Sequence, residues 1–463
     1  MTLATDRAFG TPVPTIASVL RRRGFLLLVI GQTISQFGDK LHHMALIALV
    51  GAGARNDTGG LELAKLSVVF TAPVVLFGPL AGALVDRWNK RLTMIVCDAL
   101  RALIVAAMPV VYATTGHLWS VYVAAFFVFL LGLFFNSAKM ALIPELVERP
   151  ELLSANAALT SIGRVATVAG IVGGGIILGA TLWTRMGWSA YTAGFYLDAT
   201  TFFLSVVTLL GVMLLARDPA RAHGSGAPAL RVKRSLGGLV QDVRETVGIV
   251  HRTPGLRYAF CSLLLLALFA STVYVAMTLS VQTVMGRGTR GVGYLGGLLA
   301  AGMVVGSLAV GSVGARVRRE QVIRWGIAAI GLLMIAGGFW FSFGVFVPVA
   351  FLGGALLAPV MVSQDTLLHE HAPASARAVV FSTKDLLLAV GFAGGAFLVG
   401  GGIYVLGYVG VQEPYRLVLM GVGVIITLAA LLIETWGAGA GHLHVHSSGA
   451  DTGDHAPTSV TGF

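Results

Sequence analysis

The chain has 463 residues, of which 56% are hydrophobic and only 11% are charged, and its mean hydropathy is +0.84. This composition excludes an ordinary soluble globular protein and predicts a polytopic membrane protein. A formal net charge of +11 would suit a nucleic-acid-binding protein, but the distribution of the basic residues argues against nucleic acid. If the N-terminus is cytoplasmic, about 21 Lys and Arg fall on cytoplasmic segments and about six on the opposite side, which is the positive-inside bias.

Twelve apolar stretches recur along the chain, and each is long enough to cross ~30 Å of hydrocarbon. Six lie in the first half, at residues 25–52, 63–85, 92–114, 119–143, 154–179 and 189–216. Six lie in the second half, at residues 256–284, 292–315, 322–343, 345–368, 378–408 and 415–436. The sequence therefore predicts an all-α integral membrane protein with twelve transmembrane helices in two six-helix bundles.

Polar segments divide the chain into five parts. They are a cytoplasmic N-terminal segment (1–24), a first six-helix bundle (25–216), a cytoplasmic linker (217–255), a second six-helix bundle (256–436) and a disordered cytoplasmic tail (437–463). Arg21, Arg22 and Arg23 precede a span that we expect to be retained and not cleaved as a signal peptide. Apolar and charged residues alternate with a helical period in the linker, which predicts an amphipathic helix on the membrane surface. We expect a protein of the cell (inner) membrane with both termini in the cytoplasm.

Four polar residues of the first span share one helical face, because steps of four, three and four residues separate them. They are Gln32, Gln36, Asp39 and His43. Asp39 lies about fourteen residues past the start of the span, which at ~1.5 Å per residue puts it ~21 Å deep and near the bilayer midplane. An ionisable residue at this depth faces a protein interior or a water-filled cavity. The stripe predicts a transport pathway, and a polar seam between packed helices is the alternative.

Four more ionisable residues lie deep in spans of the first half: Lys40, Arg101, Arg164 and Asp198. Opposite charges at similar depth neutralise one another, so we expect Asp39 to pair with Arg164 or Arg101. By the same argument, Asp198 should pair with Lys40. Loss of water and a nearby cation act in opposite directions on a membrane carboxylate, which can place its titration where protons bind and leave. We predict proton coupling through Asp39, relayed by His43, with a static ion pair as the alternative for Arg164 and Asp198.

The loop between the second and third spans carries a charged motif. Its members are Gly82, Asp86, Arg87, Lys90 and Arg91. The motif resembles the signature loop of the major facilitator superfamily, with Asn89 where that family has a glycine. Because Asn tolerates the left-handed backbone conformation, we expect the tight turn to persist.

A weaker copy of this motif at residues 311–319 keeps the basic residues, including Arg316, but has Ala315 in place of the aspartate. Such internal repeats are typical of duplicated transporters. The resemblance implies that Asp86 and Arg87 hold the cytoplasmic side closed. The other expected cytoplasmic gate residues are Gly82, Lys90, Arg91, Lys139, Arg316 and Lys384.

Two further resemblances concern the substrate. Residues 136–159, with Lys139 and Asn156, resemble the exporter branch that includes macrolide-efflux-like proteins and also bacterial lysophospholipid transporters, and we expect Asn156 to line the substrate and proton pathway. Residues 170–175 of the fifth span are similar to the antiporter motif of drug exporters, with Ile171 in place of its proline. These resemblances imply alternating-access export of small amphipathic molecules in exchange for protons, with a lysophospholipid translocator of the same fold as the alternative.

Other chemistry is less well supported by the sequence. Asp39, His42 and His43 resemble the first span of ferroportin-like exporters, which leaves divalent metal export as a weaker alternative. Cys97 and Cys261 lie in apolar spans and form no CxxC metal motif. The chain has no P-loop, HExxH or GxSxG motif, so we expect neither an enzyme nor a cofactor. We expect no resident metal site, and a monomer that contacts substrate, protons and membrane lipids.

Overall fold

The computed structural model describes residues 15–53, 58–215, 236–313, 318–373 and 376–438. Within these residues, the long helices of the first half are α2 (Arg23–Gly53), α3 (Gly59–Val85), α4 (Lys90–Thr115), α5 (Leu118–Leu146), α6 (Leu152–Leu178) and α8 (Ala190–Leu215). Those of the second half are α10 (Pro254–Thr272), α11 (Gly288–Val313), α12 (Arg319–Phe339), α13 (Phe343–His371), α14 (Arg377–Tyr408) and α15 (Pro414–Ala438). Two π-helical turns, η3 (Val273–Met277) and η4 (Ser280–Val284), extend α10. The short elements are α1 (Ile16–Leu20), η1 (Arg149–Glu151), α7 (Thr181–Arg185) and α9 (Leu236–Arg252).

The predicted all-α membrane fold with two sets of six long helices is confirmed. Eleven of the described helices are long and apolar enough to cross a membrane. The twelfth is α2, which carries the polar stripe with Asp39 and therefore falls outside a purely hydropathic criterion. Helix α9 lies within the segment where an amphipathic linker helix was expected. The expected tail at 437–463 lies almost wholly outside the described residues.

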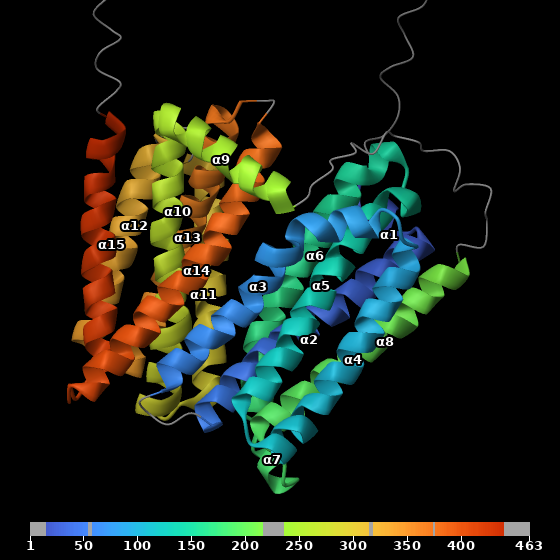
Figure 1. Cartoon of the computed structure of the whole chain (residues 1–463), viewed down its shortest axis with the longest axis horizontal. Coiled ribbons are helices and arrows are strands. Elements are labelled where there is room, and N and C mark those ends of the chain that lie inside the picture. Colours follow the sequence, from blue (N-terminus) through green and yellow to red (C-terminus); the bar gives the residue numbers. More distant parts are fainter. Residues whose placement is uncertain (1–14, 54–57, 216–235, 314–317, 374–375, 439–463) are drawn as a thin grey trace, which may run out of the picture.

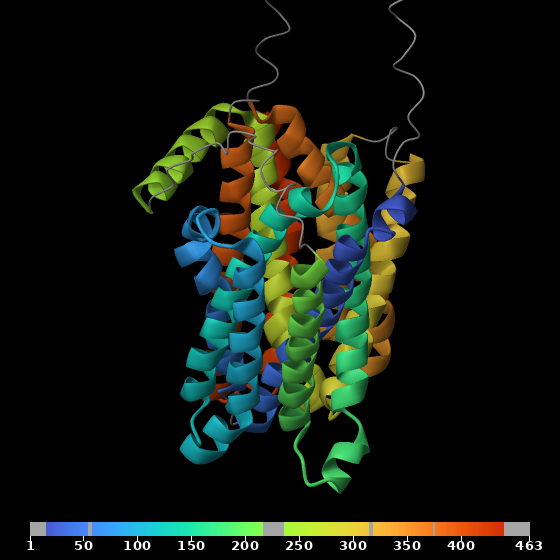
Figure 2. The same ribbon diagram turned by 90° about the vertical axis from the view of Figure 1, so that its right-hand side faces the viewer.

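The helices of each half run side by side and define two ends of the molecule. One end carries α9 and is called here the α9 end (Figure 1). The opposite end, called the distal end, carries α7, and a quarter turn of the molecule keeps α9 and α7 at opposite ends (Figure 2). The loop motif that begins at Gly82 lies between α3 and α4 at the α9 end, because α3 starts at the distal end.

Each half has its own hydrophobic core, but the halves share a core only near the distal end. The core that includes Phe25, Met94 and Val212 is built from first-half residues alone. A second core, around Leu256 and Phe346, belongs to the second half. The third contains residues of both halves, for example Leu46, Leu49 and Val50 of α2 together with Ala396, Val399 and Ile403 of α14. Burial of apolar area therefore holds the halves together toward the distal end.

Glycines bring the two halves into direct backbone contact at two places. A Cβ added to Gly60 of α3 would lie 3.1 Å from the Cα of Gly400 in α14. A Cβ added to Gly175 of α6 would lie 2.5 Å from the Cα of Gly293 in α11. Both pairs lie toward the distal end, where α3 and α11 begin and α6 and α14 end. Small residues allow membrane helices to approach this closely, so these two pairs define what we call the distal seam.

Candidate functional site

A second close helix contact, between α2 and α8, builds the polar centre of the first half. Side chains of Thr208 and Ser205 fill the space where a Cβ of Gly31 would stand, and Thr201 and Asp198 fill the space at Gly38. Gly31 and Gly38 are seven residues apart and share one face of α2. His42 lies four residues beyond Gly38 on that same face, so it enters the α2–α8 contact.

Arg101 of α4 is the centre of a buried charge cluster. Its guanidinium forms an ion pair with the carboxylate of Asp39 on α2, and its Nη1 lies 3.2 Å from Asp98 Oδ1, one turn away on α4. The Arg101 side chain is 4% exposed and that of Asp98 is fully buried, whereas that of Asp39 is 30% exposed. The guanidinium also lies 4.0 Å from the ring centroid of Phe202 on α8. Two carboxylates and an aromatic face thus compensate one buried cation.

His42 and Asp198 form a second buried pair in the α2–α8 contact. His42 Nδ1 lies 3.2 Å from Asp198 Oδ2, and the side chains are only 1% and 0% exposed. The two atoms are not aligned for a regular hydrogen bond, and each lacks another hydrogen-bond partner. Thr201 Oγ1 lies 3.3 Å from Asp198 Oδ1 and donates to this carboxylate. Unsatisfied polar atoms at this depth are costly, so their retention suggests a role beyond packing.

The structure brings together some of the predicted partners and separates others. Asp39 pairs with Arg101, one of its two expected cations, whereas Arg164 of α6 is exposed and forms no ion pair with a described residue. Asp198 pairs with His42 and not with Lys40, because the first carbons of the Lys40 side chain pack against Gly170 of α6 on another face of α2.

The predicted polar stripe on α2 is divided among several neighbouring helices. Gln32 is buried, and its Oε1 has no hydrogen-bond partner among the described residues. The Gln36 amide packs against Gly163 of α6, and Asp39 faces α4. Asn156 of α6 is exposed and forms no hydrogen bond with the described residues of the polar centre between α2 and α8. One helical face spans a wide angle, so a single stripe reaches more than one neighbour.

His43 belongs to an aromatic cluster that crosses between the halves. Its Nδ1 lies 2.6 Å from the backbone oxygen of Asp39, so the contact is with the main chain and not with the carboxylate. The ring centroid lies 4.7 Å from that of Phe70 and 5.2 Å from that of Phe129. Phe70 in turn lies 5.9 Å from Tyr274 of η3, whose hydroxyl is buried without a hydrogen-bond partner among the described residues.

The charged loop at the α9 end is held within the first half. Lys90 Nζ lies 2.6 Å from Glu145 Oε1 at the end of α5, and Arg91 lies 4.0 Å from the same carboxylate. Asn89 does not adopt the expected left-handed conformation. It is extended, with φ −69° and ψ 110°, and its Oδ1 accepts a hydrogen bond from the Leu92 amide, which caps the start of α4.

The remaining predicted gate residues have different environments. Gly82, Asp86 and Arg87 are exposed, and no ion pair joins Asp86 or Arg87 to a described residue. Lys139 is buried in α5 and donates to Asn136 Oδ1 at 2.7 Å. Lys384 of α14 pairs with Asp365 of α13 at 2.5 Å. Arg316 lies outside the described residues.

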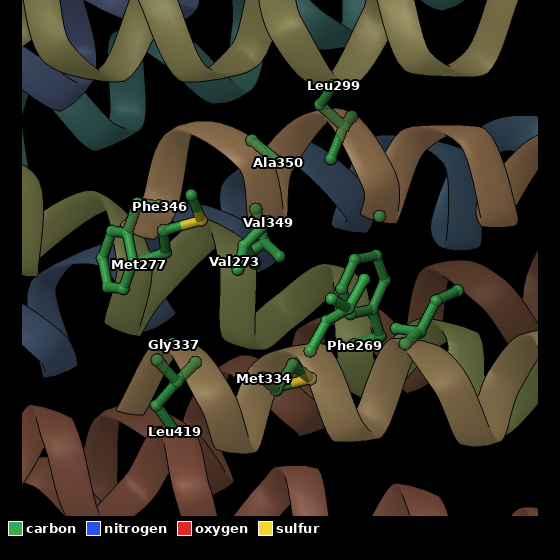
Figure 3. Close-up of a pocket in the computed structure, with 13 residues that line it drawn as sticks. Phe269, Val273, Met277, Leu299, Met334, Gly337, Phe346, Val349, Ala350 and Leu419 are labelled. Carbon is green, nitrogen blue, oxygen red and sulfur yellow. The ribbon is translucent and has the colours of Figure 1, made fainter. Parts of the chain in front are cut away.

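The second half contributes apolar space close to these groups. An apolar cavity lies inside the second half, and Val273, Met277 and Met334 are among the side chains that point into it (Figure 3). A neighbouring apolar cavity lies between the halves. Val273 and Met277 line both cavities, and Met44 of α2 lines the second. The π-helical turn η3 therefore forms part of the wall between the two cavities, and such turns are frequent at functional sites.

Sequence reasoning missed three members of the site. The sequence could have predicted the Asp98–Arg101 ion pair, because these residues are three apart in the third span and therefore lie on the same helical face. The sequence indicated His42 only as a metal ligand. His42 shares a helical face with Gly38, but only the structure shows that α8, with Asp198, packs against that face. Tyr274 lies in an apolar span and carried no signal. Among the described residues, no group of three or more His, Cys, Asp or Glu is placed to hold a metal ion.

Comparison with known proteins identifies the family. The family model of the Major Facilitator Superfamily matches residues 28–383, and the chain belongs to this superfamily. It is 30% identical over 197 residues to the uncharacterized transporter YfiS of Bacillus subtilis, a match that covers 42% of this chain and 43% of that protein. It is 24% identical to the uncharacterized transporter Mb0038c of Mycobacterium bovis, with 82% and 85% covered.

The fold has solved counterparts. A bacterial homologue of the human lysosomal transporter Spinster, in an inward-facing and unoccupied conformation, superposes with a TM-score of 0.68. The superposition covers 92% of this chain and 98% of that one at 13% sequence identity. At this identity the likeness shows the fold alone. The chain is thus a multi-pass membrane transporter of the major facilitator kind.

Proposed function

We propose that this protein is a secondary active exporter of small amphipathic molecules that exchanges its substrate for protons. The observation that carries this proposal is Asp39, a partly exposed carboxylate in the middle of a membrane helix, held by the buried Arg101. An intramembrane carboxylate that reaches an accessible surface and shares a cation is suited to exchange between a proton and a cationic group of the substrate.

The conformation is consistent with a cycle of alternating access. The shared core and the two glycine pairs of the distal seam lie toward the distal end, whereas the core at the α9 end of the first half is built from that half alone. The positive-inside bias supports an orientation in which the protein lies in the inner membrane and its α9 end faces the cytoplasm. The structure then corresponds to an inward-facing state, in which Asp86 and Arg87 of the cytoplasmic gate are released. Rocking of the two halves would close this end and open the distal seam.

The apolar cavities supply the other part of an amphipathic site. Met44 lies five residues beyond Asp39 on α2, which at ~1.5 Å per residue is ~7.5 Å along the helix axis. The cavity between the halves therefore lies at nearly the same depth as Asp39, although Met44 and Asp39 point about 140° apart around α2, so an elongated substrate would be needed to reach both. The same cavities favour the second candidate, a lysophospholipid translocator, because an acyl chain needs a longer apolar volume than a compact drug-like cation.

The two candidates differ in how transport responds to a proton gradient. We would reconstitute the protein in liposomes, impose a pH gradient and follow a fluorescent amphipathic cation and a labelled lysophospholipid in parallel. Movement of the cation that stops when the gradient is collapsed, and that is lost in Asp39→Asn, supports the proton-coupled exporter. Lipid movement that is independent of the gradient favours the translocator and contradicts the leading proposal.

A further inference from the structure

The His42–Asp198 pair has no role in a mechanism that uses Asp39 alone. It lies in the α2–α8 contact, where neither side chain reaches solvent, and it is the most deeply buried ion pair among the described residues. Removal of a carboxylate from water is expensive unless a proton or a cation neutralises it. Asp198 is therefore stable at this position only if the pair as a whole is neutral, with one proton shared between the imidazole and the carboxylate.

The groups that face this pair come from α2, α4, α5 and α8, and the one from α5 is the uncharged ring of Phe129, whose centroid lies 5.7 Å from that of His42. The carboxylate of Asp39 and the guanidinium of Arg101 act on both members electrostatically. Lys40 faces α6 instead. Arg101 lies over Phe202, one helical turn beyond Asp198 on α8, so its guanidinium is next to the face that carries Asp198. Arg101 is thus flanked by Asp39 on one side and by the His42–Asp198 pair on the other.

Charge balance suggests how the pair and Asp39 are coupled. Arg101 supplies one positive charge, and its ion-pair partners Asp39 and Asp98 supply two negative charges. Lys139 of α5 interacts electrostatically with both carboxylates and supplies the second positive charge, so these four groups together are neutral. With one shared proton, the His42–Asp198 pair is also neutral. If that proton leaves, the cluster carries one net negative charge, which a monovalent cationic substrate would neutralise again.

We infer that His42 and Asp198 hold the exchanged proton at a site hidden between α2 and α8, and that its loss draws Arg101 toward Asp198 and frees Asp39 for a cationic substrate. The inference rests on the proposed antiport. The proton passes to water by way of the partly exposed Asp39, and no covalent bond other than the one to this proton changes. Proton and substrate then use separate residues, and Arg101 is a positioning residue that connects them.

The first test needs no substrate. Infrared difference spectra of the purified protein between low and high pH report protonation of carboxyl and imidazole groups. We expect the signal of one buried titrating pair in the parent protein, lost in both Asp198→Asn and His42→Gln because the two residues share one proton. His43→Gln is the matched control, since it removes the neighbouring histidine from another face of α2, and it should keep the signal. A signal that survives in both Asp198→Asn and His42→Gln, or is lost only in His43→Gln, would overturn the inference.

The second test measures the exchange itself. Tetraphenylphosphonium is added to the protein in weakly buffered solution, and bound cation and released protons are counted. We expect about one proton released per cation bound, and an affinity that rises about tenfold per pH unit while the pair is protonated. Asp198→Asn should bind the cation weakly and without proton release. Binding of the cation by the parent protein without release of protons would contradict the coupling. No binding at all would contradict the proposed substrate class, and the infrared result would then decide the proton site alone.

Discussion

The distal seam gives the sharpest structural prediction. Gly400→Val places a branched side chain where Gly60 of α3 presents its backbone oxygen and carbonyl carbon, and a backbone contact cannot be relieved by rotating a side chain. Overpacking of this kind costs about 1–3 kcal/mol, which shifts a two-state equilibrium by about 5–150-fold. The cost falls on the conformation in which the distal ends touch, so we expect the variant to favour states in which they are apart.

The shift can be measured as a distance between spin labels on the two halves. Trp119→Cys at the start of α5 and Val409→Cys after α14 provide exposed attachment sites at the distal end, once Cys97 and Cys261 have been replaced by Ser. We expect Gly400→Val to add a longer-distance population in pulsed electron–electron spectroscopy.

The neighbouring Gly401 provides the control. No atom lies within 4 Å of a Cβ added there, so Gly401→Val has the same composition and the same effect on helix propensity without the clash. The distance distribution of Gly401→Val should match that of the parent. If Gly400→Val leaves the distribution unchanged, or if Gly401→Val shifts it equally, the distal seam does not hold the halves together as described.

Three further predictions concern single side chains. Arg101→Met should lower the free energy of unfolding by about 3–5 kcal/mol, because it leaves the buried Asp98 without its cation. Asp39→Asn should lower it much less, because Asp39 is partly exposed, and thermal unfolding in detergent compares the two variants. Tyr274→Phe should change stability by no more than about 1 kcal/mol, because the buried hydroxyl has no hydrogen-bond partner among the described residues, and a larger loss in the same assay would reveal one. Asp86→Asn should slow transport without changing the substrate dissociation constant, and a changed constant with normal turnover would contradict its role in the gate.

The fold was predictable because each membrane-spanning helix needs a long run of apolar residues, which can be recognised in the sequence. The spans expected from hydropathy agree with the helices to within four residues at each end. The loop motif was sufficient to identify the superfamily, which the family model confirms. Asn89 shows the limit of motif reasoning. Its type is compatible with either a left-handed turn or a helix cap, and only the path of the chain into α4 determines which of the two is formed.

The site was only partly predictable, because depth along a helix does not give direction around it. Asp39 and Arg101 could be matched by charge and depth, and they do pair. The partner of Asp198 could not be found in this way, since Lys40 and His42 are two residues apart and face different helices. Glycines determine that difference: Gly38 admits α8 on one face of α2, and Gly170 of α6 receives Lys40 on another.

In the proposed antiport, substrate and proton movements are coupled through Asp39. The most direct measurement reverses the usual driving force. Liposomes that contain the protein and a pH-sensitive dye are given a tetraphenylphosphonium gradient, no initial pH gradient and a clamped membrane potential. We expect the parent protein to drive protons in the direction opposite to the cation, and Asp39→Asn to move none. Cation movement by the parent protein without any proton movement would contradict this coupling.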